Sequence, residues 1–330
     1  MCLGKAARRL ALLLVPPFGL VDSTKHARTS RYVAFIHPME FAAPLKMIGL
    51  IAHAEKADAG GVVREIVSEL ERNALPFLLH KNTAPLAGLT SDLDESSLAE
   101  HCELLVVVGG DGTILRVVQR IKCHLPIIFG INIGALGFLT CLGSSEIRRA
   151  VECIQRADYV LSRRALLRAV LTQTSGDAST LFALNDVVVS RGERSQLVQM
   201  RVTLGGIPLT DYNADGLVVA TPTGCTAYSL SAGGPILMPD SGGFVITPIC
   251  PHVLTNRSVV VSDSSVVEIQ VAKPGQVAFV SVDAQSWFPM SGGDSLRLEK
   301  SDRFLPLAML PERPFTEVLR RKLKWTGSNL

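Results

Sequence analysis

The stretch that decides the fold is Leu104–Thr113, LLVVVGGDGT. Its first five residues are apolar without interruption, which is typical of a strand buried on both faces of a parallel sheet. Three glycines around one aspartate come next, and then a helix whose apolar face is formed by Ile114, Val117, Val118 and Ile121. A buried strand, a glycine-rich turn and a helix together predict an α/β domain whose ligand crevice lies at this turn.

The same alternation extends to both sides of that stretch. Strands are expected at Met47–Ala52, Pro76–His80 and Pro126–Ile131. A helix is expected between the first two strands, because the spacing i, i+3, i+4, i+7 recurs in Val63, Ile66, Val67 and Leu70. Strands alternating with helices predict a Rossmann-like N-terminal α/β domain with a mostly parallel sheet over residues 47–143.

The hydrophobic period changes after a helix expected near Ser144–Arg156, which is interpreted as the bridge to a second domain. Apolar and polar residues alternate over residues 198–204, and Gly205-Gly206 then predicts a two-residue hairpin turn. Further strands are expected at Leu166–Leu171, Leu181–Ser190, Leu217–Thr221, Phe244–Thr247, Ser258–Val261, Val266–Val271, Val277–Val282 and Ser295–Leu298. Residues 144–300 are therefore predicted to form a β-rich C-terminal domain, and residues 301–330 a segment that packs back on the N-terminal domain.

Composition narrows the class of protein. The 330 residues carry a net charge of only +3, which indicates neither a nucleic-acid footprint nor a polybasic membrane surface. Seven scattered cysteines without a C-x-x-C pair argue against a disulfide framework and a zinc site. No apolar stretch is long enough to span a bilayer. A cytoplasmic protein in a reducing compartment, with no nucleic-acid or membrane partner, is expected.

Residues 1–46 precede the first expected strand and are interpreted as an N-terminal extension or an over-long start without a role in the fold. Basic residues before the apolar run Leu10–Val15 faintly resemble the beginning of a secretory signal, but no cleavage-site pattern follows closely. Met47, which opens the first expected strand, is a natural beginning for the folded region.

The turn at Gly109, Gly110, Asp111, Gly112 and Thr113 predicts a phosphate site. The glycines remove side chains that would keep a phosphate from backbone N–H groups, and Thr113 can cap a helix whose positive end favours anions. The Asp111 carboxylate would repel a phosphate at this turn. Its presence therefore suggests a function, such as accepting a hydroxyl proton or helping to hold a metal ion. The motif is neither a Walker A loop nor G-x-G-x-x-G. A turn in which Asp111 makes local hydrogen bonds is the alternative.

Two later segments also carry polar groups where strands are expected. Asn185-Asp186 interrupts an apolar run, which marks either a bulge or a pair of side chains aimed at a ligand. A carboxylate can bind a ribose by accepting hydrogen bonds from its two vicinal hydroxyls. Asp215–Pro235 leads a strand into a Thr-Pro-Thr-Gly turn and a short hydroxyl-rich helix, where a flat ring and a pyrophosphate could approach closely. A capped helix with a Gly-Gly-Pro stop is the alternative for this segment.

Taken together, the three segments resemble the NAD kinase family, whose members use ATP or polyphosphate. Asn132–Leu139 and Thr247–His252 also look like family segments, so that the resemblance covers about Met47 to Ser286. Three positions depart from the family pattern. Asp186 stands where Glu is frequent, Cys225 where Ser is usual, and Ser281–Gln285 where Phe-Asp-Gly is common, which weakens any role for Asp283.

The resemblance implies that Asp111 is the catalytic carboxylate and that Gly109, Gly110, Gly112 and Thr113 face the phosphate donor. It implies an NAD site made of Gly112, Asn185, Asp186, Asp215, Thr223, Thr226, Ala227, Tyr228 and Ser231. Within it, Asn185 and Asp186 would hold the adenosine ribose and Asp215 would contact the nicotinamide half. Mg²⁺ without an assigned protein ligand, NAD and ATP or polyphosphate as substrates, and a homodimer or homotetramer are implied as well.

Two alternatives stay open at this stage. A lipid kinase of the diacylglycerol or sphingosine type shares the G-G-D-G loop and a β-rich second domain, but it does not need Thr221–Gly234 as written. A non-catalytic NAD-binding module would keep the dinucleotide segments, although it would have no use for Asp111. The pair Arg163-Arg164 could bind phosphates. Alternatively, both side chains could lie on a strand face that is exposed to solvent.

Overall fold

A computed structural model describes residues 47–192 and 196–325, so the predicted N-terminal extension, residues 1–46, lies outside the described residues. The helices are α1 (Ala59–Arg72), η1 (Ala84–Ala87), α2 (Glu95–His101), α3 (Asp111–Arg120), η2 (Ser144–Glu146), α4 (Ile147–Arg156), η3 (Gly224–Thr226), α5 (Tyr228–Ser231) and α6 (Phe315–Lys322). The first strands are β1 (Ile48–Ala52), β2 (Phe77–Leu79), β3 (Leu104–Gly109), β4 (Ile127–Asn132), β5 (Leu142–Gly143), β6 (Val160–Thr172), β7 (Ala178–Ala183), β8 (Asp186–Ser190) and β9 (Val198–Leu204). The remaining strands are β10 (Ile207–Ala214), β11 (Gly216–Ala220), β12 (Gly243–Ile249), β13 (Val259–Ser262), β14 (Val267–Val271), β15 (Val277–Val282), β16 (Ser286–Ser291) and β17 (Ser295–Met309).

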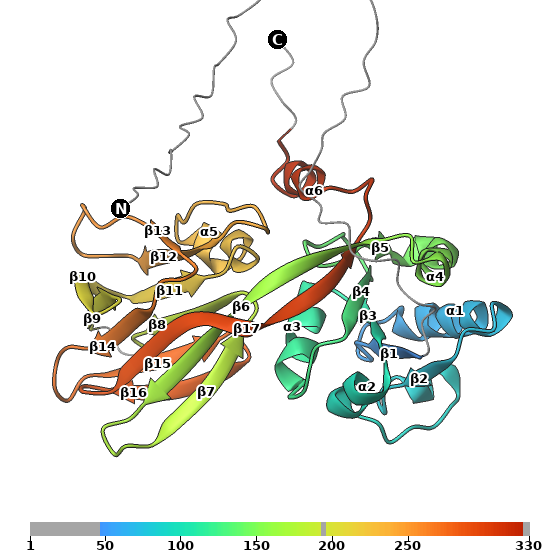
Figure 1. Cartoon of the computed structure of the whole chain (residues 1–330), viewed down its shortest axis with the longest axis horizontal. Helices are drawn as coiled ribbons and strands as arrows, with labels where there is room; N and C mark the ends of the chain where they lie inside the picture. Colours follow the sequence, from blue (N-terminus) through green and yellow to red (C-terminus); the bar gives the residue numbers. More distant parts are fainter. Residues whose placement is uncertain (1–46, 193–195, 326–330) are drawn as a thin grey trace, which may run out of the picture. The chain divides into compact units, whose positions relative to one another are not determined.

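The N-terminal part is a doubly wound α/β layer (Figure 1). Its strands lie in the order β2-β1-β3-β4, with β5 beside β4, and every pair is parallel. One face of β1, β3 and β4 packs on α1 and α4, and the other on α2 and α3. The uninterrupted apolar run of β3 is buried because both its faces are covered. The predicted Rossmann-like, mostly parallel sheet is confirmed.

The C-terminal part is β-rich, as predicted. A six-stranded antiparallel sheet has the order β13-β12-β11-β8-β15-β16. It shares one apolar core with the antiparallel strands β6, β9, β14 and β17 of the larger sheet. The two long strands β6 and β17 pair along almost their whole length and run from the β-rich part into the α/β part (Figure 1).

The chain crosses between the two parts on strands rather than on the helix predicted for this task. The helix α4 packs in the same apolar cluster as α1, so residues 147–156 belong to the α/β layer and β6 makes the crossing. On the return, β17 continues through residue 300, and its Leu307 pairs in parallel with Ile128 of β4. Near the end of the chain, Phe315 of α6 lies against Phe138, with ring centroids 5.9 Å apart.

Strands that the sequence pattern did not predict lie at sheet edges. The predicted Gly205-Gly206 turn is confirmed, with φ of +56° and +81°, and it joins β9 to β10. The strands β10 and β16 are edge strands and contain Pro208 and Pro289. Proline is tolerated at an edge because no neighbour needs its missing N–H. Because of these prolines, the sequence pattern did not indicate β10 and β16. Each has only one neighbouring strand and does not need a continuous apolar run.

The predicted strand Leu181–Ser190 is two strands. β7 ends at Ala183 and β8 begins at Asp186, and the two pair with different neighbours. At the break, the Asp283 carboxylate accepts the backbone N–H groups of Leu184, Asn185 and Asp186, and residues 184 and 185 belong to neither strand. The polar pair marks a junction, one of the two interpretations open at the sequence level.

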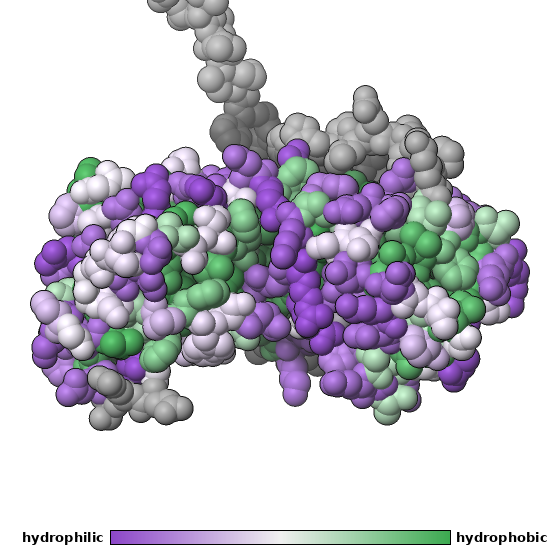
Figure 2. All heavy atoms as spheres, turned by 90° about the horizontal axis from the view of Figure 1, so that it is seen from below, coloured by the Kyte–Doolittle hydropathy of each residue, from purple (hydrophilic) through white to green (hydrophobic). Residues whose placement is uncertain are grey.

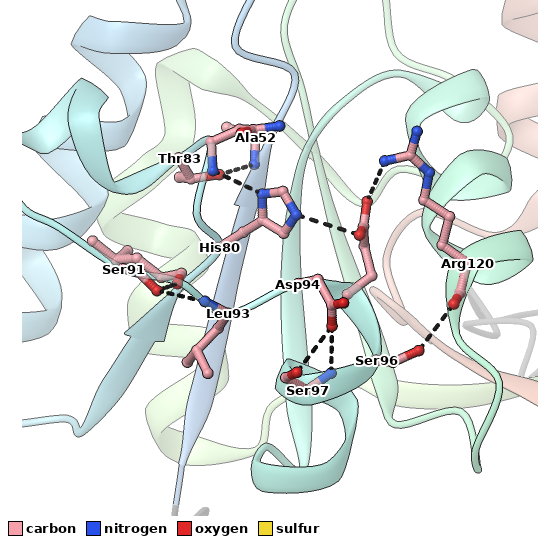
Figure 3. A network of polar contacts seen from close by, with 12 residues as sticks. Ala52, His80, Thr83, Ser91, Leu93, Asp94, Ser96, Ser97 and Arg120 are labelled. Carbon is pink, nitrogen blue, oxygen red and sulfur yellow. Dashed lines mark hydrogen bonds and ion pairs between the residues drawn. The ribbon is translucent and has the colours of Figure 1, made fainter.

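The helix α2, which the sequence analysis missed, is held by a buried polar network (Figure 3). Asp94 caps it by accepting the Ser97 N–H (2.9 Å). Next to this cap, the Glu95 carboxylate contacts His80 Nε2 at 3.3 Å and Arg120 Nη1 at 2.9 Å. Glu95 thereby ties the start of α2 to the residue after β2 and to the last residue of α3.

The face of the molecule shown in Figure 2 carries a band of hydrophilic side chains across its middle, with apolar atoms in patches on either side. Separate apolar patches of this kind are normal for a folded surface. Within the described ranges, no helix combines the length and the apolar character needed to cross a bilayer.

Candidate active site

The glycine-rich turn joins the end of β3 to the start of α3. β3 ends at Gly109, Gly110 has extended backbone angles, and α3 begins at Asp111. The Gly110 N–H donates to Oγ1 of Thr113 (3.3 Å), so Thr113 caps the helix from within its first turn. Asp111 is therefore the first helical residue. The first N–H groups of a helix have no partner inside the helix, and this end of α3 suits an anion.

Two backbone N–H groups hold the Asp111 carboxylate. Phe138 donates to Oδ2 (2.8 Å) and Leu139 donates to Oδ1 (3.0 Å). The loop that carries these donors approaches because Gly137 has no side chain: a Cβ there would lie 2.0 Å from Asp111 Oδ1. Each carboxylate oxygen keeps room for a second hydrogen bond. Asp111 is thus fixed in place and still able to accept a proton or a hydrogen bond from a ligand.

Asn185 and Asp186 lie at the junction between β7 and β8. The Asn185 N–H donates to Asp283 Oδ1 (2.7 Å), and the Asn185 carbonyl accepts from the Thr221 N–H (2.9 Å). Within residues 47–192 and 196–325, neither the Asn185 amide nor the Asp186 carboxyl makes a side-chain hydrogen bond. The backbone of this pair is held from two sides, and its side chains are available to a ligand.

Gly224 brings the third predicted segment against the second. A Cβ at Gly224 would lie 2.0 Å from the Asn185 carbonyl oxygen, so only glycine allows this approach. Thr221 adds a hydrogen bond from its Oγ1 to the Leu184 carbonyl (2.5 Å). The turn at residues 221–224 and the junction at residues 184–186 therefore form one unit, although about 37 residues separate them in the chain.

These segments open into a cavity of about 370 Å³. Four predicted residues line it: Asn185, Asp186, Ala227 and Tyr228. Leu115 of α3 lines it as well, one helical turn after Asp111, which is about 6 Å along the helix axis. The other lining residues are Val188, Ser190, Ser281, Asp283, Ala284 and Trp287. The cavity thus reaches within one helical turn of the carboxylate predicted to be catalytic.

Other predicted residues lie around this cavity without lining it. Asp215 accepts a hydrogen bond from Arg191 Nε (2.7 Å) at the opposite end of the β8–β11 pair. Along the strands, Asp215 lies about five residues from Asp186, which is about 16 Å at ~3.3 Å per residue. Thr223 is buried, Thr226 donates to the Thr223 carbonyl (3.2 Å), and Ser231 is exposed. The residues of the glycine-rich turn also lie outside the lining.

Arg164 is not on the solvated strand face that was one interpretation of the Arg163-Arg164 pair. Its side chain is only 2% exposed, and its Nη1 lies 3.5 Å from Thr223 Oγ1. Burial lowers the pKa of this guanidinium to about 10, and the nearby Asp111 carboxylate opposes that shift. The sequence pattern missed this residue because its strand, β6, crosses between the two parts and is covered where it crosses.

Asp283 is the residue of the site that the sequence analysis left without a role. It is 3% exposed and accepts N–H groups from residues 97 to 99 positions earlier in the chain. The available signal was an aspartate directly after the apolar run Val277–Val282. Nothing local in the sequence indicates that its hydrogen-bond partners come from the distant junction before β8.

The Asp186 carboxyl has a strongly raised pKa. Burial raises the pKa of Asp186 to about 7, and the neighbouring Asp283 carboxylate adds to the shift. A hydroxyl that donates to the Asp186 carboxylate would favour its charged form. Within the described ranges, no group of three or more His, Cys, Asp or Glu side chains could hold a metal ion by itself.

A larger hollow of about 710 Å³ lies beside the bulge of β17 and contains none of the predicted site residues. Its basic side chains already have partners. Arg163 stacks on the Phe304 ring at 3.9 Å, and Lys300 pairs with Asp263. This hollow therefore does not compete with the cavity beside α3 as the candidate site.

Comparison with known proteins places these features in one family. The model of the ATP-NAD kinase N-terminal domain matches residues 48–159, and that of the ATP-NAD kinase C-terminal domain matches residues 184–310. Among curated relatives, the NAD kinase of Syntrophotalea carbinolica is 36% identical over 282 residues, which is 85% of this chain and 99% of that protein. The NAD kinase of Symbiobacterium thermophilum is 38% identical over 280 residues, 84% of this chain and 98% of that protein.

Two solved structures of NAD and NADH kinases have the same fold as this chain. Yeast NADH kinase in complex with NADH superposes with a TM-score of 0.79 at 25% identity, covering 87% of this chain and 90% of that one. An NAD kinase from Archaeoglobus fulgidus in complex with ATP superposes with a TM-score of 0.66 at 25% identity, covering 85% of this chain and all of that one. With relatives of this identity matched over almost their full length, the chain belongs to the NAD kinase family of enzymes.

Proposed function

We propose that this enzyme transfers the terminal phosphoryl group of ATP, or of polyphosphate, to the 2′-hydroxyl of the adenosine ribose of NAD. One observation carries the proposal. The cavity that contains Asn185 and Asp186 is walled by Leu115, one helical turn from Asp111. A ribose held by the first two side chains would lie near the carboxylate that the reaction needs.

The role of Asp111 follows from how it is held. A general base must keep its geometry while a proton moves, and the N–H groups of Phe138 and Leu139 provide that constraint. Asp111 would accept or orient the proton of the 2′-hydroxyl as the oxygen attacks the phosphorus. Positioned acid–base catalysis of this kind contributes about 10² to 10⁴ in rate.

The donor would bind at the N-terminus of α3. The phosphates would meet the N–H groups of Asp111 and Gly112, which have no acceptor among the described residues, whereas Thr113 and Ile114 donate to the Gly110 carbonyl. Magnesium commonly binds through one or two carboxylates together with substrate phosphates, and the single carboxylate at this turn fits that mode. The ion would arrive with the donor and, when bound, would neutralise charge on the phosphate oxygens, with Asp111 beside it.

The dinucleotide would extend along the β8–β11 pair. Asn185 and Asp186 at one end would select the ribose hydroxyl, with Tyr228 and Ala227 beside the adenosine. Asp215 at the other end would meet the nicotinamide half. Thr223, Thr226 and Ser231 would shape the turn and short helix that support this wall.

Location and assembly are also proposals. All six cysteines of the described ranges have free thiols, which supports a reducing compartment such as the cytoplasm. Family resemblance supports a homodimer or homotetramer. Light scattering of the purified full chain measures the assembly directly.

The test is NADP formation by the purified full chain with NAD, magnesium and either ATP or polyphosphate. Asp111→Asn should fold and bind NAD but lose turnover by about 10²-fold or more, because the amide cannot accept the proton. Asp94→Asn is the matched control, since Asp94 also accepts a backbone N–H at the start of a helix but lies outside the site. Equal turnover in the Asp111 and Asp94 variants would refute the role of Asp111. NAD binding without NADP from either donor would instead indicate a non-catalytic module.

A further inference from the structure

We propose that Asp283, on the turn between β15 and β16, is a positioning residue that sets the place of Asn185 and Asp186 for the ribose of NAD. The inference rests on the proposed function, because it assigns a task in that reaction to a turn outside the glycine-rich and Thr-Pro-Thr-Gly segments. It concerns a residue that makes its contacts to the backbone of the ribose-binding pair.

The Asp283 carboxylate holds three consecutive backbone N–H groups. Leu184 donates to Oδ2 (2.8 Å), and Asn185 and Asp186 donate to Oδ1 (2.7 and 3.1 Å). The Asp283 N–H in turn donates to the Asp186 carbonyl (3.0 Å). Hydrogen bonds to an ionised group are about twice as strong as neutral ones. The backbone that carries the two ribose-binding side chains is therefore fixed by one carboxylate.

Gln119 connects this carboxylate to the helix that begins with Asp111. Its Nε2 donates to Asp283 Oδ2 (2.9 Å) and to the Phe182 carbonyl (2.5 Å). Gln119 lies eight residues after Asp111 on α3, about 12 Å along the helix axis. Asp283 thus binds both the ribose-binding junction and the helix that presents the proposed base, so it sets one relative to the other.

The backbone at this turn is that of a tight hairpin between β15 and β16, closed by the Gln285 N–H donating to the Val282 carbonyl (2.9 Å). Asp283 and Ala284 have φ of +48° and +55°, the left-handed region that non-glycine residues rarely adopt. Such conformations persist where surrounding contacts determine them, and they gather at functional sites. Here the hairpin turn itself requires these conformations, and the N–H donors to the carboxylate together with the backbone bond to Asp186 hold the turn against residues 184–186.

The charge of Asp283 also acts on Asp186. Burial raises the pKa of both carboxyls, but the four N–H donors make Asp283 the member of the pair that ionises first. Tyr228 is the other titratable side chain among the lining residues, and no Lys, Arg or His lines the cavity to offset this charge. An ionised Asp283 therefore disfavours ionised Asp186 until hydroxyl donors from a ligand arrive.

Asp283→Asn tests the proposal because it keeps the shape and removes the charge and one acceptor. Asp294→Asn is the matched control. Asp294 is a carboxylate buried to the same degree, on the turn before β17, and it accepts the N–H groups of Thr174 and Ser291 (both 2.8 Å) outside the cavity. NADP formation gives kcat and the KM values for NAD and ATP across pH, and calorimetric titration gives NAD binding without turnover.

We expect Asp283→Asn to raise the KM for NAD by about tenfold or more while the KM for ATP changes less than about twofold. The pH below which NAD binding weakens should move down, because removing the Asp283 charge lowers the pKa of Asp186. Asp294→Asn should keep the wild-type NAD KM and pH profile. Unchanged NAD binding and pH profile in folded Asp283→Asn, or the same changes in both variants, would overturn the proposal.

Gln119→Leu covers the case in which Asp283→Asn does not fold, since it keeps the Asp283 carboxylate and its three backbone donors and removes the two bonds from α3, to Asp283 Oδ2 and to the Phe182 carbonyl. It should raise the KM for NAD by about threefold to tenfold, and an unchanged NAD KM would overturn the proposal. Titration separates this result from the proposed function. Wild-type protein that binds NAD but forms no NADP would defeat the proposed function, and the binding difference between wild type and Asp283→Asn would still decide the role of Asp283.

Discussion

At the scale of single residues, two glycines bring the parts of the site into contact. Gly137 lets a loop reach the Asp111 carboxylate, and Gly224 lets the Thr-Pro-Thr-Gly turn reach the Asn185 carbonyl. The sequence analysis interpreted the glycines at 109, 110 and 112 as room for phosphates and assigned no such role to Gly137 or Gly224. The structure adds a second reason, which is close approach between segments of the protein itself.

Gly224→Ala should damage NAD binding and stability together. The new Cβ would lie 2.0 Å from the Asn185 carbonyl oxygen, and two backbone segments would have to separate. Overpacking of this kind costs about 1–3 kcal/mol, and the KM for NAD should rise as Asn185 moves. Urea unfolding and steady-state kinetics measure both effects.

Gly61→Ala is the control for that experiment. Gly61 lies in α1 with nothing within 4 Å of its added Cβ, and the substitution should stabilise the protein by up to about 1 kcal/mol. Wild-type stability and an unchanged NAD KM in Gly224→Ala would show that the close approach is not required.

Residues that act through distant partners could not be predicted. Asp111, Asn185 and Asp186 stood out because a carboxylate in a phosphate turn and a polar pair in an apolar run contradict local preference. Asp283 follows a strand at a turn, where aspartate is ordinary. Its partners are 97 to 99 residues away, and only the packing of β15 beside β8 brings them together.

At the scale of elements, hydrophobic period predicted the covered strands and most of the helices, and it missed the two edge strands that contain proline and the short helix α2. β1, β3 and the first five residues of β4 carry no polar side chain because helices cover both faces. β10 and β16 contain proline and lie at sheet edges. The helix α2 has only seven residues, too few for its period to be clear, and its capping aspartate, Asp94, was the available signal.

Glu95 is expected to stabilise α2 in a pH-dependent way. Burial by itself would raise the pKa of this carboxyl, but hydrogen bonds from His80 and Arg120 lower it to about 2 (Figure 3). A depressed pKa contributes stability above the unfolded value of 4.5, and this contribution is lost as the pH falls toward 2. Glu95→Gln should therefore lower the free energy of unfolding by about 2 kcal/mol at pH 7 and by much less at pH 3.

Glu317→Gln serves as the control for Glu95. Glu317 faces Arg321 at 3.7 Å on the exposed side of α6, where an ion pair contributes at most about 0.5 kcal/mol. Urea unfolding at pH 7 and pH 3 compares the two variants. A Glu95→Gln effect that is the same at both pH values would contradict the account of this network.

At the scale of the whole molecule, the α/β part and the β-rich part were both predicted, and the way they are joined was not. The long pair β6 and β17 makes the crossing, and the sequence pattern predicted only Leu166–Leu171 near the end of β6 and Ser295–Leu298 at the start of β17. Gln119 and Asp283 make a second connection near the cavity. The site therefore depends on residues of both parts.

The central claim is that this site phosphorylates one hydroxyl of NAD. The direct measurement is incubation of the full chain with magnesium, ATP and either NAD or an NAD analogue that lacks the 2′-hydroxyl of the adenosine ribose. The nucleotide products are then separated and the phosphate position assigned by NMR. We expect NADP from NAD and no phosphorylated product from the analogue. Absence of NADP, or a phosphate added to the analogue at comparable rate, would contradict the account.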